Sequence, residues 1–278
     1  MRIGVNYQLK YSTPEDWIAC LRSLGVCAAV SPVQPGADTD TVAAYKRAAE
    51  ENGILIGEVG VWNNPIARDE AKRRAAVERC KEGLRLADEL GALCCVNITG
   101  SRGEIWDSYH PDNYSADTYA LIVDTIREII DDVQPVRTCY SAEPMPWMLP
   151  DSPESYLKLL RDVDRSGFGI HMDYTNMINS FDRYRNRRAF LGHAFHLLAP
   201  YIRSVHIKDM ALKPGLPLIM QETVPGEGDI DLGHVLRLCS ELDHEVTLFL
   251  EHMPELSQYV NGLSNIRRTA AKVGVMLG

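Results

Sequence analysis

The chain has 278 residues, of which 45% are hydrophobic, and its 38 acidic and 29 basic residues give a formal net charge of −9. This length suits one α/β barrel, and no Pro-, Gly- or Ser-rich linker divides it, so we expect a single domain over residues 1–278. The acidic balance argues against a nucleic-acid partner. No apolar run approaches the roughly 18 residues of a membrane span, which argues against membrane insertion.

The cysteines and the first residues of the chain indicate in which cellular compartment the protein is expected. The seven cysteines form no CxxC pair and mostly fall within apolar patterns, as buried free thiols of a reducing compartment do. The start, MRIGVNYQLKYSTPEDW, has no apolar segment after a basic one and so does not resemble a secretory signal. We therefore expect a cytoplasmic protein.

Eight short β-rich runs alternate with helical patterns, which is typical of repeated βα units and a parallel sheet. The predicted strands are residues 2–6, 26–30, 54–62, 92–98, 136–143, 168–173, 202–208 and 246–251. Eight such strands predict an α/β fold of the (β/α)8 TIM barrel type, in which all strands end on one face.

The helices between these strands have recognisable ends. Two of them are expected to begin with a capping residue, a proline and an acid, at residues 13–15 and 152–154. Four glycines fall just past predicted helix ends, where a left-handed residue is favoured: Gly25, Gly53, Gly91 and Gly167.

The connections differ in length on the two sides of the predicted barrel. Those from a helix into the next strand are short, whereas those that leave strands are long, as in residues 99–113, 144–150, 174–185 and 209–228. Barrel enzymes build their sites from the loops after the strands, so we expect the function there. The longest, 209–228, is expected to be a structureless lid or binding loop.

Four polar residues stand where the fifth to eighth predicted strands end: Glu143, Asp173, His206 and Glu251. Side chains alternate along a strand, and each of the four falls on the face opposite to apolar neighbours. If all four side chains point into the barrel, they meet around one point. Three carboxylates and one imidazole suit a divalent metal ion.

Each of these residues also has a structural explanation when taken alone. A strand-end Asp or Glu often caps the next helix, and a single strand His is commonly a hydrogen-bonded core residue. Their shared parity at successive strand ends favours a common site. His252 and Asp209 alternate away from that site, and we expect them to serve in outer packing and as a helix cap.

Five segments together carry a family pattern: residues 141–143 (SAE), 171–176 (HMDYTN), 205–209 (VHIKD), 224–229 (VPGEGD) and 250–252 (LEH). They resemble the sugar isomerase/epimerase superfamily with the xylose-isomerase-like TIM barrel, which also includes the apurinic endonucleases. The resemblance covers nearly the whole chain. It implies that Glu143, Asp173, His206 and Glu251 bind one divalent ion, with Mn as the first expectation and Mg, Co or Zn as alternatives.

The resemblance also implies an activity, that of a divalent-metal-dependent aldose/ketose isomerase or epimerase acting on a small sugar or polyol. Proton transfer beside a carbonyl passes through an enediolate, which a metal stabilises as a Lewis acid. Two carboxylates then remove and return the proton, and the resemblance assigns these roles to Glu143 and Glu251. The expected partner is a small carbohydrate, and the sequence leaves open whether the chain forms a homo-oligomer.

Further inward or loop residues are candidate substrate contacts: Glu58, Trp62, Asn97, His171, Asn176, Lys208 and Glu227. Trp62 is expected either to stack on a sugar face or to pack at the barrel mouth. Lys208 is expected to reach a substrate oxygen or a developing charge. Glu227 either enters the site from loop 209–228 or belongs to a simple glycine-rich turn.

Two departures from the family pattern limit what the resemblance implies. Epimerases of the family typically have a His three residues after the metal Asp, where this chain has Asn176, so substrate contacts at that position stay open. The endonuclease branch uses extra histidines of the third and fourth strands, whereas the first His of this chain is His110. A three-metal phosphodiesterase is therefore disfavoured.

Other functions stay open at this stage. The same metal ion and carboxylates could catalyse an elimination, in which case the protein would be a dehydratase or a keto-glycoside lyase. A non-catalytic sugar-binding barrel or partner subunit is expected to lack one or more of the metal ligands. This chain has all four. A phosphorylated substrate is disfavoured, because the chain after the eighth strand has no glycine-rich phosphate loop. Only the glycine-containing segment before Asp229 could serve that purpose.

Overall fold

The computed structural model describes residues 1–278, and eight parallel strands form its centre. In chain order these are β1 (Arg2–Val5), β2 (Ala28–Val30), β3 (Leu55–Gly60), β4 (Cys94–Asn97), β5 (Tyr140–Ala142), β6 (Phe168–Asp173), β7 (Ile202–His206) and β10 (Thr247–Leu250). Neighbours follow the order β1-β10-β7-β6-β5-β4-β3-β2. The amide of Cys27 donates to the carbonyl of Ile3 at 3.1 Å, so the start of β2 lies beside β1 and the barrel is nearly closed.

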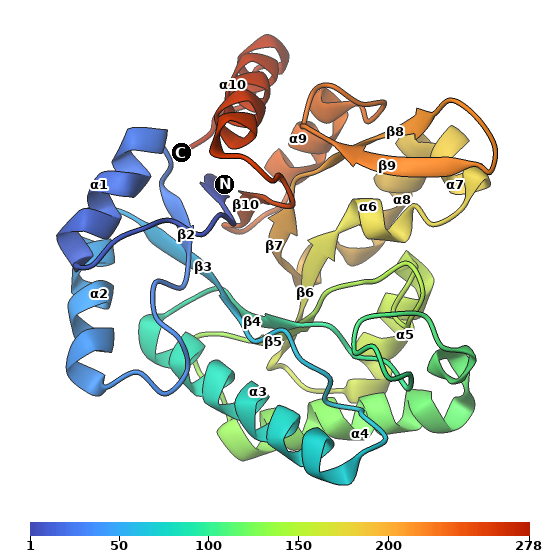
Figure 1. The fold of residues 1–278 in the computed structure, drawn as a ribbon. Coiled ribbons are helices and arrows are strands. Elements are labelled where there is room, and N and C mark those ends of the chain that lie inside the picture. Colours follow the sequence, from blue (N-terminus) through green and yellow to red (C-terminus); the bar gives the residue numbers. More distant parts are fainter.

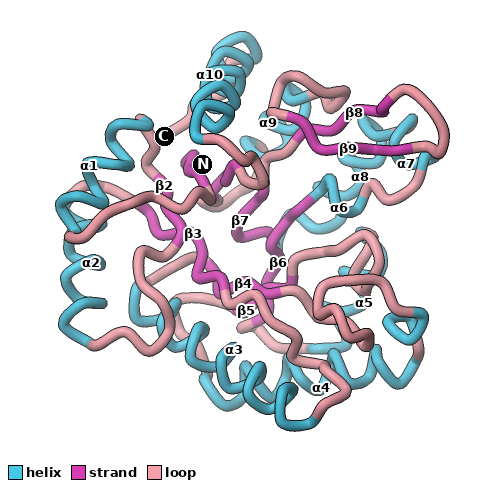
Figure 2. The backbone as a smooth tube through the Cα atoms, in the orientation of Figure 1, coloured by secondary structure: helices cyan, strands magenta, loops and turns pink.

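Helices surround the strands (Figures 1 and 2). They are α1 (Pro14–Leu24), α2 (Thr39–Glu51), α3 (Glu70–Leu90), α4 (Ala116–Val133), α5 (Pro153–Val163), α6 (Tyr174–Met177), α7 (Phe181–Arg185), α8 (Arg187–Leu198), α9 (Leu232–Ser240) and α10 (Leu256–Val273), with 3-10 turns η1 (Pro111–Tyr114) and η2 (Ala199–Tyr201). The predicted (β/α)8 barrel is confirmed. None of the helices has the length and apolar character that crossing a bilayer requires.

The predicted helix starts are confirmed, and the predicted ends are confirmed in part. Thr13 and Ser152 cap α1 and α5 by accepting hydrogen bonds from main-chain amides, and a proline follows each cap. The glycines at positions 25, 53 and 91 have positive φ. Gly167 does not, because α5 ends three residues earlier, where Asp164 takes the left-handed conformation with φ 49°.

Phe249 fills the barrel interior against two glycines. A Cβ atom on Gly4 would lie 2.5 Å from the Phe249 ring, and one on Gly57 would lie 2.6 Å from the ring and 2.4 Å from Oγ1 of Thr247. Phe249 is fully buried. Close packing leaves no room for side chains at these two strand positions.

The strands are mostly shorter than predicted, and one prediction about the loops is wrong. Only the strand over residues 168–173 has the expected bounds. Residues 209–228 are not structureless: β8 (Asp209–Lys213) and β9 (Ile219–Thr223) pair antiparallel as a hairpin. In Figure 1 this hairpin extends beside the ends of β6 and β7.

Asp209 anchors the base of this hairpin, so its expected role as a helix cap is wrong. Its buried carboxylate accepts hydrogen bonds of 2.8–3.0 Å from the main-chain amides of Met210, Gly226, Gly228 and Ile230. The reason is local: the chain continues from β7 directly into β8, and residues 226–230 return to the same point. One carboxylate therefore joins the start of the hairpin to the segment that follows it.

Candidate functional site

Four acidic or imidazole side chains meet at the carboxyl ends of neighbouring strands. Asp173 and His206 are the last residues of β6 and β7, while Glu143 and Glu251 directly follow β5 and β10. One potential ligand atom from each lies within 4.8 Å of the others. All four residues are buried. The predicted convergence is therefore present in the structure.

His206 lies at the centre of this group. Its Nδ1 atom is 2.7 Å from Oε1 of Glu251, 3.4 Å from Oε1 of Glu143 and 3.7 Å from Oδ2 of Asp173. Nδ1 of His206 makes no regular hydrogen bond, and Oδ2 of Asp173 and Oε1 of Glu251 are held by ion pairs with the ammonium of Lys208. Three oxygen donors and one nitrogen donor gathered in this way fit a divalent ion such as Mn²⁺ or Mg²⁺.

Lys208 supplies a buried positive charge beside this group. Its Nζ atom lies 2.6 Å from Oδ2 of Asp173 and 2.6 Å from Oε1 of Glu251. It also donates to Oε1 of Glu222 at 3.2 Å. Three carboxylates balance the two charges of a divalent ion plus one ammonium. Lys208 thus pairs with two of the oxygens that would also face a bound cation.

The two glutamates have pKa values shifted in opposite directions. Burial raises the pKa of Glu143 above its usual range, although His206 opposes this. Burial acts on Glu251 in the same sense, but the charges of His206 and Lys208 outweigh it and lower its pKa to about 2. Burial also raises the pKa of Asp173, but the positive charge of Lys208, together with His206, has a larger opposite effect. The pKa of Asp173 therefore lies well below its usual value. Asp173 and Glu251 are therefore ionised at neutral pH and attract a cation.

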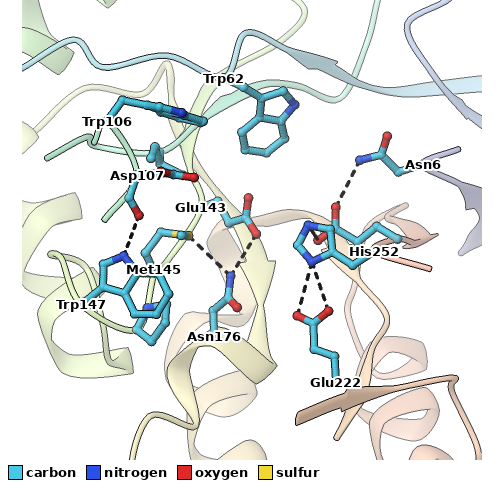
Figure 3. A pocket seen from close by; sticks show the side chains of 13 residues that line it. Asn6, Trp62, Trp106, Asp107, Glu143, Met145, Trp147, Asn176, Glu222 and His252 are labelled. Atoms are coloured by element: carbon cyan, nitrogen blue, oxygen red, sulfur yellow. Dashed lines mark hydrogen bonds and ion pairs between the residues drawn. The ribbon is translucent and has the colours of Figure 1, made fainter. Parts of the chain in front are cut away.

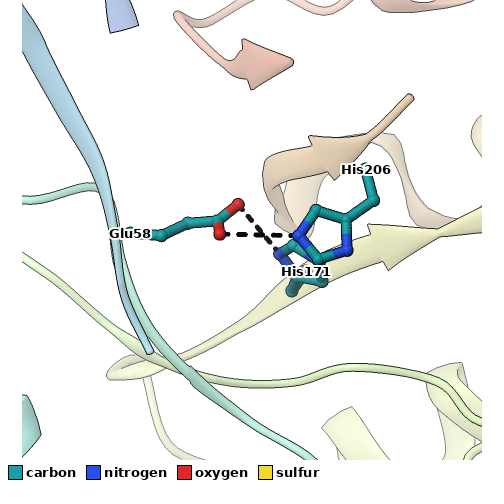
Figure 4. Close-up of side chains that lie close together, drawn as sticks. All are labelled: Glu58, His171 and His206. Atoms are coloured by element: carbon teal, nitrogen blue, oxygen red, sulfur yellow. Dashed lines mark ion pairs between the residues drawn. The ribbon is translucent and has the colours of Figure 1, made fainter. Parts of the chain in front are cut away.

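A second buried group lies beneath the first and shares His206 with it (Figure 4). Glu58 on β3 places Oε2 at 3.6 Å from Nε2 of His206 and Oε1 at 3.2 Å from Nδ1 of His171. Nδ1 of His171 also lies 2.6 Å from Oγ of Ser204. Glu58 therefore faces the imidazole nitrogen of His206 that points away from the four-residue group.

The four-residue group opens into a pocket of about 430 Å³ through Glu143 and Glu251. An asparagine amide pairs with each glutamate: Asn176 donates to Oε1 of Glu143 at 3.1 Å, and Asn6 donates to Oε2 of Glu251 at 3.2 Å. The remaining lining residues, all drawn and mostly labelled in Figure 3, are Trp62, Ile98, Trp106, Asp107, Met145, Pro146, Trp147, Glu222 and His252. The volume is within the usual range for small-molecule sites.

The predicted substrate contacts lie in different places. Trp62 and Asn176 line the pocket. Glu58 and His171 are buried below it. Asn97 faces the helix layer, unlike its predicted placement in the site: its side chain bonds to Asn63 and to Sγ of Cys80 on α3, because Cys94, three residues earlier on the same strand, occupies the inner face. Lys208 lies beside the ligand atoms, as described above.

Glu227 lies outside the pocket, unlike its predicted placement in the substrate site. It is exposed, and its Oε1 accepts a hydrogen bond of 2.6 Å from Asn261 on α10. The turn around it packs on α10 instead of folding over the barrel mouth, since Asn265 also donates to the carbonyl of Pro225 at 2.9 Å. The glycines on either side thus serve a turn.

Several pocket residues are not among those predicted. His252 was expected to pack outside the barrel, but its positive φ of 61° turns the chain, and Nδ1 lies 3.1 Å from Nζ of Lys208 and 3.1 Å from Oε2 of Glu222. Glu222 comes from β9 and was missed because the hairpin was missed. Trp106 and Trp147 could have been predicted from the sequence, since both are aromatic residues in the long loops after strands.

Comparison with known proteins gives one family and a set of similar folds. The family described as "Xylose isomerase-like TIM barrel" matches residues 21–269. No curated protein sequence matches the chain. Solved structures that resemble it do so at low sequence identity.

Three of these structures illustrate the range. A xylose isomerase-like TIM barrel protein from Mycobacterium smegmatis in complex with magnesium is 14% identical, with a TM-score of 0.69 over 94% of this chain and 89% of that one. The 3-keto-D-glucoside 4-epimerase from E. coli is 15% identical, with a TM-score of 0.72 over 96% and 99%. A protein described as the probable 3-DHS dehydratase of petrobactin synthesis from Bacillus anthracis is 16% identical, with a TM-score of 0.69 over 94% of each chain. At these identities the likeness is one of fold.

Proposed function

Because the chain belongs to the xylose isomerase-like TIM barrel family, we propose that it is a metal-dependent isomerase or epimerase acting on a small sugar or polyol. The observation that carries this proposal is the convergence of three buried carboxylates and one buried imidazole at the floor of an open pocket. Buried charges are normally paired or coordinate a metal ion, and the single ammonium of Lys208 contacts only two of the three carboxylates.

The proposed metal ligands are Glu143, Asp173, His206 and Glu251. A divalent ion held there would act as a Lewis acid toward the oxygens of a bound sugar. We propose Mn²⁺ or Mg²⁺, because three oxygen donors outnumber one nitrogen donor, and a neighbour of the same fold was crystallised with magnesium.

The proposed proton carriers are Glu143 and Glu251, which face the pocket from strands on either side of β6 and β7. One carboxylate removes a proton from the carbon beside the carbonyl, and a carboxylate on the other side returns a proton. Asn176 and Asn6 hold one oxygen of each glutamate and thereby fix the carboxylate planes.

The first test measures metal content and proton exchange on the same protein. Purified protein loaded with Mn²⁺ is incubated in D₂O with a panel of sugars and keto-sugars, and deuterium incorporation is followed by NMR. We expect incorporation that Glu143→Gln and Glu251→Gln each reduce at least 100-fold. Glu227→Gln is the matched control, because this glutamate is exposed and outside the pocket, and it keeps full activity.

The outcome also separates the alternative reactions. Deuterium uptake without release of water or an aglycone supports isomerisation or epimerisation. Loss of a leaving group instead supports a dehydratase or lyase, the second candidate, which the dehydratase of the same fold favours. A protein that binds sugars but no divalent ion, and that incorporates no deuterium, would be a non-catalytic sugar-binding barrel. Turnover unchanged in both glutamate variants would overturn the roles proposed for Glu143 and Glu251.

A further inference from the structure

Three tryptophans gather at the rim of the pocket. Trp62, Trp106 and Trp147 line it, and between 37% and 39% of each is exposed. They come from three different loops, which follow β3, β4 and β5. The fourth tryptophan of the chain, Trp17, is buried in the core. Three large aromatic surfaces held open to solvent at one pocket indicate a binding surface for a flat, weakly polar ligand face.

These rings are available for stacking on a ligand. None of the three pairs with another aromatic ring of the chain. The indole N–H of Trp147 donates to the main-chain carbonyl of Asp107 at 2.7 Å, which ties the loop after β5 to the loop after β4. An orientation held in this way lowers the entropy lost when a ligand binds.

The tryptophans border the proposed reaction centre on two sides. In Figure 3, Trp106 and Trp147 lie on the side of Glu143 and Met145, Trp62 lies above the centre, and Glu222 and His252 lie on the side opposite to Trp106 and Trp147. The pocket beside Trp106 and Trp147 is available for a second part of the same ligand.

Charge does not restrict the second part of the ligand to one sign. Four carboxylates line the pocket, those of Asp107, Glu143, Glu222 and Glu251, together with the imidazole of His252. Trp62 and Trp106 also line an adjoining cavity, whose lining includes Arg68, Lys72, Arg79 and Arg102. The class of the second part therefore depends on the tryptophan surfaces and not on charge.

We infer that the substrate is a glycoside, whose second ring, a sugar or an aromatic aglycone, lies against Trp62, Trp106 and Trp147. The inference rests on the proposed function for the identity of the reacting ring, and it adds the chemical class of the rest of the substrate. Free monosaccharides fill only the reaction centre.

Binding to the full chain loaded with Mn²⁺ tests this class directly. Isothermal titration compares two ligands in each of the gluco, galacto and xylo series: the free sugar and its phenyl β-glycoside. In at least one series we expect the glycoside to bind tenfold or more tightly than the free sugar. The inference is overturned if no glycoside binds more tightly than its free sugar.

Variants locate the preference on the tryptophan rim. Trp106→Ala and Trp147→Ala are each expected to reduce the ratio of glycoside to free-sugar affinity at least fivefold. Tyr201→Ala is the control, since Tyr201 is an aromatic residue of similar exposure, 38%, in the turn before β7, away from the pocket. An unchanged ratio in both tryptophan variants would also overturn the inference.

The binding assay and the proton-exchange assay fail independently. Tryptophan-dependent glycoside binding without deuterium exchange on any sugar would overturn the proposed reaction and leave the glycoside site in place. Deuterium exchange on free sugars without any glycoside preference would overturn only the inference made here.

Discussion

The Nζ atom of Lys208 lies 2.6 Å from Oε1 of Glu251, so a buried ammonium touches a carboxylate that also faces the proposed metal position. Both groups are almost completely buried. The ammonium and a bound cation therefore act on the same carboxylates, and loss of one is expected to increase dependence on the other.

Replacing this lysine should make the fold depend on metal. Without metal, Lys208→Met leaves buried carboxylates without a counter-charge, and breaking a buried pair costs about 3–5 kcal/mol. We expect a lower melting temperature in EDTA, and a larger rise on addition of Mn²⁺ than the wild type shows. Differential scanning fluorimetry measures both, with exposed Lys213→Met as the control. Equal rises in the variant and the wild type would contradict this account.

Glu58 is expected to control metal affinity through His206. Its Oε2 atom faces Nε2 of His206 at 3.6 Å, which favours the orientation that presents Nδ1 to the other ligands. Removing such a partner typically weakens metal binding about 10–100-fold. Competition with a fluorescent chelator should show a loss of that size for Glu58→Gln and none for Glu227→Gln. Unchanged affinity would assign Glu58 to core packing alone.

Asp209 is expected to hold the hairpin β8–β9 in place. Asp209→Ala removes the acceptor of four main-chain amides, and each buried donor left without a partner costs about 1–3 kcal/mol. We expect faster trypsin cleavage at Lys213 and a lower free energy of unfolding in urea. Asp124→Ala, at an exposed position of α4, should change neither. Cleavage at the wild-type rate would mean that other contacts hold the hairpin.

Gly57 is expected to tolerate no side chain while Phe249 is present. A Cβ atom would lie 2.6 Å from the Phe249 ring, and overpacking of this kind costs about 1–3 kcal/mol. Urea denaturation should show that loss for Gly57→Ala. Phe249→Leu makes room, so the double variant should lose less than the sum of the two single variants. Strict additivity would contradict direct contact between the two positions.

The sequence predicted the barrel and the site floor because both depend on strand periodicity. Asp173 and His206 end strands that alternate in the expected way, and parallel strands of a barrel must end on the same face. Each residue could therefore be placed by its own strand alone. Glu143 and Glu251 were found for the same reason.

The walls of the pocket depend on contacts between distant segments, which periodicity does not describe. Glu222 reaches the site only because a hairpin forms where a loop was expected, and His252 does so only through a positive φ. Glu227 leaves the site because its turn packs on α10. The sequence by itself determined the barrel type and which residues end its strands; tertiary structure alone decided which loop side chains meet over them, because loop conformation is set by non-local hydrogen bonds such as those of Asp209.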